Sequence, residues 1–128
     1  MTDDYKNNRI VIVDDDPALA EFVSDAVDFL GYTPLVVDGG RHCLEQVNKN
    51  APVCVILDVV MPDMDGVELL SKLAASHSNA PAVIVMSGYD GKYLESVSLI
   101  GEANGLNVLG TLKKPFSVDQ LEGLLAQL

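Results

Sequence analysis

Residues 10–16 read Ile-Val-Ile-Val-Asp-Asp-Asp, so four apolar residues lead without a break into three carboxylates. Successive β-branched residues are typical of a strand that is covered on both faces, as in a parallel sheet. Asp16 precedes Pro17 and has a structural role as the cap of a helix. Asp14 and Asp15 have no such role, and two carboxylates about 5 Å apart repel by roughly 3 kcal/mol at an effective dielectric constant near 20. This strand end therefore indicates a site that needs clustered acids.

Five short apolar runs alternate along the chain with segments in which apolar residues have helical spacing. The runs are Ile10–Val13, Leu35–Val37, Val53–Leu57, Ala82–Met86 and Val108–Leu112. The helical segments cover about residues 17–30, 41–48, 66–76, 92–104 and 118–127. Five βα units of this length predict an α/β fold, a doubly wound parallel sheet with helices on both faces. We expect one domain over residues 1–128, with ligands bound at the carboxyl ends of its strands.

The composition excludes several classes of function. Eight Lys and Arg stand against 19 Asp and Glu, which gives a formal net charge of −11 and too few cations for a nucleic-acid-binding patch. The apolar runs are far too short to span a membrane, and the polar start does not resemble a signal peptide. We therefore expect a cytoplasmic protein that contacts neither nucleic acid nor membrane directly. Cys43 and Cys54 form no metal-ligand spacing and should be reduced thiols.

Side chains suited to phosphoryl chemistry follow the other strands of the expected sheet. Asp58 follows the third apolar run, Ser87 follows the fourth and Lys114 comes just after the fifth. Because the carboxyl ends of the central strands lie close together, these residues should converge with Asp14 and Asp15 on one shallow site. Mg²⁺ would supply the counter-charge that three carboxylates need, since it binds carboxylate and carbonyl oxygens and keeps positions for water and phosphate. One carboxylate could then attack phosphorus and form an aspartyl-phosphate, stabilised by the cation and the lysine.

Taken together, these motifs resemble a response-regulator receiver domain of two-component signalling. The resemblance covers about residues 9–125 and rests on Asp14-Asp15, Asp58, Met61-Pro62, Met64-Asp65-Gly66, Ser87-Gly88 and Lys114-Pro115-Phe116. It implies a flavodoxin-like (βα)₅ fold with strand order 2-1-3-4-5, as in single-domain chemotaxis regulators. It also implies that Asp58 is the phospho-accepting residue. The Mg²⁺ ligands would be Asp14, Asp15, Asp58 and the backbone carbonyl of Val60.

The same resemblance assigns a conformational switch. The hydroxyl of Ser87 would move toward the phosphoryl group, and Lys114 would be the invariant lysine, usually followed by a cis proline. At the strand-five position that is often Tyr or Phe in the family, this sequence has Thr111. The aromatic half of the usual switch is therefore missing, and we expect the change to depend more on the loop after Ser87 and the helix that follows.

The resemblance also implies partners. A sensor histidine kinase or a phosphotransfer protein of a phosphorelay would donate the phosphoryl group. The domain itself would be no enzyme in the usual sense, but an acceptor with self-catalysed phosphorylation and dephosphorylation. Its conformational change would control an output domain, fused after residue 128 or separate, and a homodimer is compatible with this scheme. Residues 103–116 are also similar to receivers attached to EAL-type cyclic-di-GMP phosphodiesterase domains.

Three alternatives share part of the pattern. A fragment of a haloacid-dehalogenase-type phosphatase would carry its nucleophile after the first strand in an Asp-x-Asp pattern, whereas adjacent acids stand here. A flavodoxin-type flavin carrier needs a phosphate-binding loop after strand one, and three aspartates there would repel a flavin phosphate. A degenerate receiver would act only as a protein-interaction module. Mg²⁺-dependent formation of one phosphoryl adduct would distinguish a working receiver from the last two.

Overall fold

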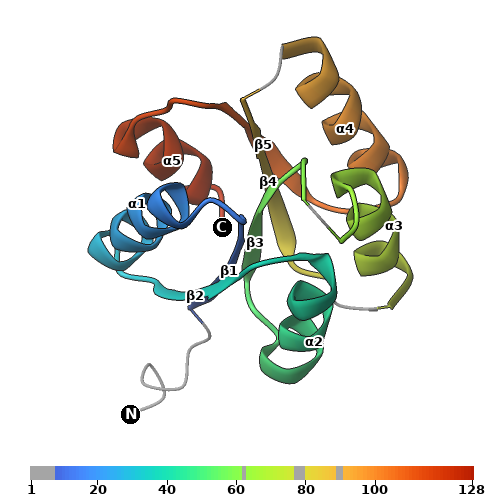
Figure 1. Ribbon diagram of the computed structural model, residues 1–128, viewed down its shortest axis with the longest axis horizontal. Helices are drawn as coiled ribbons and strands as arrows, with labels where there is room; N and C mark the ends of the chain where they lie inside the picture. The colour runs from blue at the N-terminus through green and yellow to red at the C-terminus, as the bar shows by residue number, and fades with distance from the viewer. Residues whose placement is uncertain (1–7, 62, 77–79, 89–90) are drawn as a thin grey trace.

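The computed structural model describes residues 8–61, 63–76, 80–88 and 91–128, and in these the strands and helices alternate throughout (Figure 1). The elements are β1 (Arg9–Val13), α1 (Pro17–Phe29), β2 (Thr33–Val37), α2 (Gly40–Asn50), β3 (Cys54–Asp58), α3 (Gly66–Ser76), β4 (Ala82–Ser87), α4 (Gly91–Ala103), β5 (Val108–Lys113) and α5 (Val118–Leu125). The strands form one parallel sheet in the order β2-β1-β3-β4-β5. The expected flavodoxin-like strand order is thereby confirmed.

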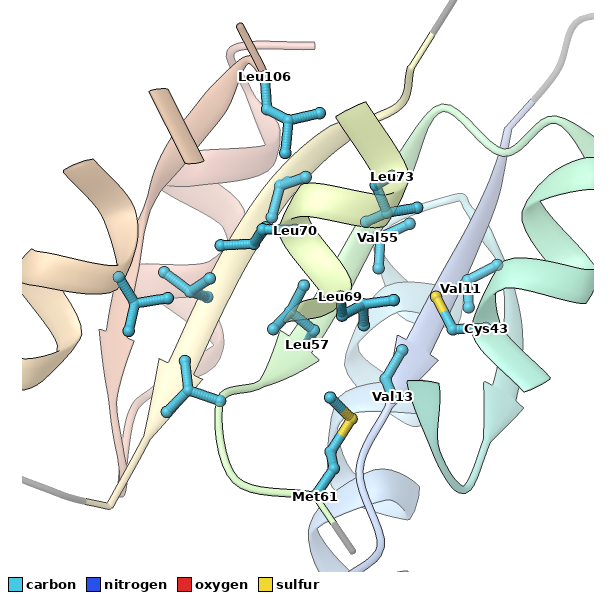
Figure 2. Packing of buried hydrophobic residues seen from close by; sticks show 14 of the residues in the cluster. Val11, Val13, Cys43, Val55, Leu57, Met61, Leu69, Leu70, Leu73 and Leu106 are labelled. Carbon is cyan, nitrogen blue, oxygen red and sulfur yellow. The ribbon is translucent and has the colours of Figure 1, made fainter. Parts of the chain in front are cut away.

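The sheet is covered on both faces, which explains why its central strands are continuously apolar. Helices α1 and α5 lie on one face, and α2, α3 and α4 lie on the other (Figure 1). Val11 lies beside Cys43 of α2, and Val55 lies beside Leu73 of α3, all within one buried cluster (Figure 2). Their neighbours in the chain belong to the core on the α1–α5 face. Because successive side chains of a strand point to opposite faces, both sets are buried only when helices cover both sides.

Two helix starts are set by side chains that the sequence marks as caps. The carboxylate of Asp16 accepts hydrogen bonds from the backbone N–H groups of Ala18, at 3.1 Å, and Leu19, at 3.5 Å, and so begins α1. Ser117 and Gln120 form a capping box at the start of α5. Such caps satisfy N–H groups that have no partner inside the helix. The predicted cap at Asp16 is confirmed.

The central strand β3 and its neighbour β4 extend further than the apolar runs suggest. Asp58 is the last residue of β3 and pairs with Met86, and Ser87 is the last residue of β4 and pairs with Lys113. Both polar residues are buried. They therefore belong to the sheet itself and are held more firmly than residues of a surface loop would be.

The two cysteines are inert parts of the core. Cys43 and Cys54 are buried free thiols, and burial raises the pKa of each to about 12. A thiol with so high a pKa forms little of the reactive thiolate at neutral pH. Within the part of the chain that the structure describes, no helix combines the length and the apolar character needed to cross a membrane.

Candidate functional site

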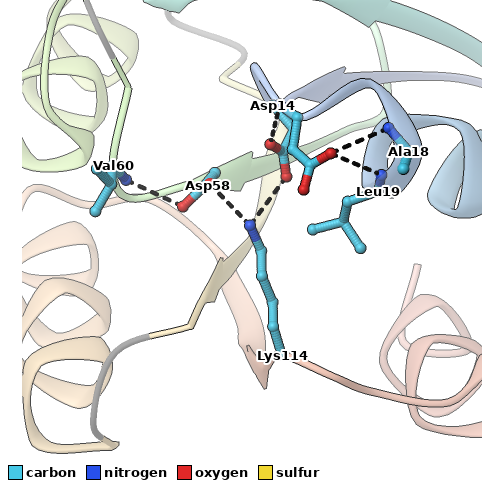
Figure 3. A network of polar contacts seen from close by, with 7 residues as sticks. Asp14, Ala18, Leu19, Asp58, Val60 and Lys114 are labelled. Atoms are coloured by element: carbon cyan, nitrogen blue, oxygen red, sulfur yellow. Dashed lines mark hydrogen bonds and ion pairs between the residues drawn. The ribbon is translucent and has the colours of Figure 1, made fainter.

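Three of the expected residues meet at the carboxyl ends of β1, β3 and β5. The Nζ atom of Lys114 donates hydrogen bonds to Oδ2 of Asp14, at 3.1 Å, and to Oδ2 of Asp58, at 2.8 Å (Figure 3). Asp14 comes directly after β1, and the strand order places β1 beside β3. The lysine reaches both carboxylates from the segment that follows β5. Lys114 therefore bonds one residue that lies 100 positions earlier in the sequence and another that lies 56 positions earlier.

Backbone N–H groups fix the other oxygen of each carboxylate. Oδ1 of Asp14 accepts from the N–H of Asp16 at 2.9 Å, and Oδ1 of Asp58 accepts from the N–H of Val60 at 3.1 Å. In both cases the donor lies two residues further along the chain. Asp14 is 3% exposed and Asp58 is 6% exposed. The two carboxylates are therefore held in place before any ligand binds.

The electrostatics of the site keep Lys114 charged beside the two buried carboxylates. Burial raises the pKa of Asp14, and the bonds from Asp16 and Lys114 only partly offset this. Burial lowers the pKa of Lys114, but its bonds to Asp58 and Asp14 outweigh that effect and leave the pKa raised. The lysine therefore remains an ammonium ion at neutral pH. It supplies the counter-charge for the clustered acids in the ligand-free protein.

Asp15 completes a set of oxygen ligands. Asp14, Asp15 and Asp58 each offer a carboxylate oxygen, and these oxygens lie within 4.8 Å of one another. Asp15 is exposed, whereas the other two residues are buried. A hard cation with few protein ligands and several waters fits such a half-open oxygen site, which is the arrangement that Mg²⁺ prefers.

Ser87 lies at the same edge of the sheet. It is completely buried at the end of β4, and its backbone carbonyl accepts a hydrogen bond of 2.9 Å from the N–H of Lys114. The peptide bond between Lys114 and Pro115 is cis, as the family resemblance implies. Pro62, the second residue of the Met61-Pro62 pair, lies outside the described residues.

Thr111 is exposed on β5, unlike the buried residues of the site. A register shift between β4 and β5 pairs Val83 with Val108 and Ile84 with Gly110, so Leu109 is an extra residue on β5. Such a bulge changes which face the following side chains occupy. As a result Leu109 and Leu112 are both buried, while Thr111 between them is exposed.

The site gives a first prediction, for the protein without metal. Asp14→Asn should raise the free energy of unfolding at pH 7 by about 1 kcal/mol, because the fold disfavours the charged form of this buried carboxyl group. When folding raises the pKa of a carboxyl group, ionisation of that group destabilises the folded state at higher pH. This destabilisation disappears once the pH falls below the pKa that the group has in the unfolded chain. The difference between variant and wild type should therefore vanish near and below pH 3.8.

Urea denaturation in EDTA at several pH values would measure this difference. Asp15→Asn is the matched control, and because Asp15 is exposed it should change stability by less than about 0.5 kcal/mol. An Asp14→Asn variant that is less stable than wild type at pH 7 would contradict this account of the site's electrostatics.

Comparisons with known proteins agree with the geometry. Residues 10–126 match the family described as the response regulator receiver domain. The chain is 30% identical over 115 residues to sporulation initiation phosphotransferase F of Bacillus subtilis, covering 90% of this chain and 88% of that protein. It is 31% identical over 117 residues to the transcriptional regulatory protein FixJ of Bradyrhizobium diazoefficiens, covering 91% of this chain and 54% of that protein.

A solved structure extends the likeness. The beryllofluoride-activated NtrC4 receiver domain dimer is 25% identical in sequence and superposes with a TM-score of 0.78, covering 93% of this chain and 94% of that one. The fold and the convergent acids define a receiver domain of two-component signalling. The chain belongs to the response regulator receiver family. This chain spans only about half the length of FixJ, so the likeness concerns the receiver part of that protein and not its activity as a whole.

Proposed function

We propose that Asp58 accepts a phosphoryl group from a phosphohistidine of a sensor kinase or of a phosphotransfer protein. The observation that carries this proposal is the position of its carboxylate, held at Oδ1 by the N–H of Val60 and at Oδ2 by Lys114. Asp58 is also the acid that ends a central strand of the sheet, between β1 and β4. A fixed carboxylate beside a lysine is suited to form an acyl phosphate.

The residues of this chain divide the work of the transfer. A carboxylate oxygen of Asp58 attacks phosphorus, the P–N bond of the phosphohistidine breaks, and its electron pair stays on the imidazole nitrogen, which takes a proton from solvent. Lys114 leaves the carboxylates and pairs with the oxygens of the new phosphoryl group, and the hydroxyl of Ser87 moves toward them. Mg²⁺ held by Asp14, Asp15, Asp58 and the carbonyl of Val60 would neutralise charge on the phosphoryl oxygens when bound.

Transfer in this scheme changes the surface around β5 and its neighbouring helices. A phosphoryl group adds a charge of about −1.5 to −2 and strong acceptor oxygens, which draw Ser87 and Lys114 inward. Helix α4 carries exposed apolar side chains at Tyr93, Leu99 and Ile100, a surface on which a partner could respond to that movement. We propose that the domain works in the cytoplasm and controls a fused or separate output domain through this face. The solved receiver dimer makes a second copy a further candidate partner.

Phosphoryl labelling of the wild-type protein tests this function. Incubation with a small acyl phosphate and Mg²⁺ should give one adduct per chain, detected as the mass increase of a single phosphoryl group. Excess EDTA should reduce the labelling strongly, because the ion neutralises the charge that develops during transfer. A degenerate receiver that acts only as an interaction module would take up no phosphoryl group under either condition, and that result would overturn the proposal.

A further inference from the structure

The loop between β3 and α3 is tied to the start of α2 by a single carboxylate. Oδ2 of Asp63 accepts a hydrogen bond of 3.1 Å from the N–H of Arg41, and Oδ1 accepts one of 3.0 Å from the N–H of Gly40. These bonds, to Arg41 and to Gly40, hold the pKa of Asp63 below its usual value. The carboxylate is therefore ionised at neutral pH and lies at the positive end of the helix.

The sequence at the start of α2 is fitted to receive this carboxylate. Gly39 is the N-cap residue and makes no side-chain cap of its own. A Cβ atom at Gly39 would lie 2.6 Å from Oδ1 of Asp63 and 2.9 Å from its Cγ, so any side chain there would displace the carboxylate. At Gly40 a Cβ atom would collide with the side chain of Met64, the next residue of the loop. Two adjacent glycines thus allow the loop to lie directly against the helix start.

The same loop carries the backbone of the candidate metal site. It begins at Asp58, whose Oδ1 accepts from the N–H of Val60 (Figure 3). Its far end is fixed where Gly66 donates to the carbonyl of Val59, at 2.9 Å, and where Asp65 caps α3. Asp63 lies between these two ends and fastens the middle of the loop to α2.

We propose that Asp63 is a positioning residue of the metal site. By fastening the loop to the start of α2, it holds the backbone at Val60 in the orientation in which its carbonyl can bind Mg²⁺. This inference rests on the proposed function, since the Val60 carbonyl is a ligand only if Mg²⁺ binds there. Helix α2 then affects metal affinity through this contact, although it supplies no ligand. Because such coupling is reciprocal, Mg²⁺ binding should also change the environment of the Gly40 and Arg41 amides.

Mg²⁺ titration of an Asp63→Ala variant, followed by amide chemical shifts, tests the role. The dissociation constant should rise about tenfold, the lower end of the range for removing groups that orient metal ligands. Asp119→Ala removes the same charge from an exposed position in the first turn of α5 and should leave the affinity unchanged. In wild type, the Gly40 and Arg41 amide signals should shift on addition of Mg²⁺.

A second variant distinguishes positioning from simple capping of α2. Adding Gly39→Ser to Asp63→Ala gives the helix a cap of its own, at a position whose extended backbone suits any residue and where the colliding carboxylate is gone. Stability should recover while the weaker Mg²⁺ binding persists. Recovery of both would overturn the proposal, as would an unchanged affinity in Asp63→Ala. A wild-type protein that binds no Mg²⁺ would overturn the metal-dependent function as well, so the two failures are distinguishable.

Discussion

Asp58→Asn is expected to abolish the phosphoryl adduct while the fold stays intact. The amide has nearly the shape of the carboxylate, and its oxygen can still accept the hydrogen bond from the N–H of Val60. It lacks the nucleophilic oxygen that would attack phosphorus, so labelling by a small acyl phosphate in Mg²⁺ should fall to background. Intact-protein mass spectrometry measures the adduct, and circular dichroism reports on the fold.

The matched control for this variant is Asp119→Asn. It makes the same change of an acid to its amide at an exposed position in the first turn of α5, far along the chain from the site. It should label as well as wild type. If Asp58→Asn labelled equally well, the acceptor would have to be another carboxylate, and the assignment of Asp58 would be wrong.

Lys114→Met should destabilise the metal-free protein by about 2 kcal/mol. The variant keeps most of the side chain's length but removes the ammonium ion that bridges two buried carboxylates. Leaving a buried charged group without its partner typically costs about 1–3 kcal/mol or more. We expect a loss near the middle of that range because the lysine side chain is itself partly exposed. Denaturation in EDTA at pH 7 measures the loss. Because Mg²⁺ supplies a replacement charge, saturating Mg²⁺ should restore a larger share of stability to this variant than it adds to wild type.

The neighbouring lysine provides the control. Lys113→Met makes the same substitution at an exposed residue and should change stability by less than about 0.5 kcal/mol. Equal effects of the two substitutions would show that the ion pair at Lys114 contributes nothing specific. An unchanged loss in saturating Mg²⁺ would argue against a cation binding among these acids.

The fold could be predicted because the apolar runs that favour strands are also the segments that helices bury on both faces of the sheet. Every apolar run became a strand, and the continuous burial of the central strands follows from helices on both faces. The bulge at Leu109 could not be predicted, because it is a property of the pairing between β4 and β5 and not of either strand alone. It decides that Thr111 is exposed, which no periodicity in the sequence reveals.

The site was predictable to the extent that each residue follows a strand end. Asp14, Asp58 and Lys114 meet as expected because the sheet order brings those ends together. The sequence does not reveal that Lys114 bonds both buried acids in the ligand-free protein. The two hydrogen bonds from the start of α2 to Asp63 span 22 and 23 residues and could not be predicted from the sequence either. The paired glycines at positions 39–40 indicate only a helix start without a side-chain cap of its own.

The functional roles of the site residues stay predictions, and so do two finer assignments. The binding of Mg²⁺ by the Val60 carbonyl depends on an ion that the geometry accommodates. The similarity of residues 103–116 to receivers attached to EAL-type phosphodiesterase domains concerns the output, which a receiver domain by itself does not specify. Both depend on interactions beyond the fold of this chain.

Direct location of the phosphoryl group tests the central claim most sharply. An acyl phosphate can be reduced by borohydride, which converts the modified aspartate to homoserine, and peptide mass spectrometry then identifies the residue. After labelling with an acyl phosphate and Mg²⁺, the modification should map to Asp58 and should disappear when EDTA is present during labelling. Homoserine at Asp14 or Asp15 in place of Asp58, or the absence of any modified aspartate, would contradict the account.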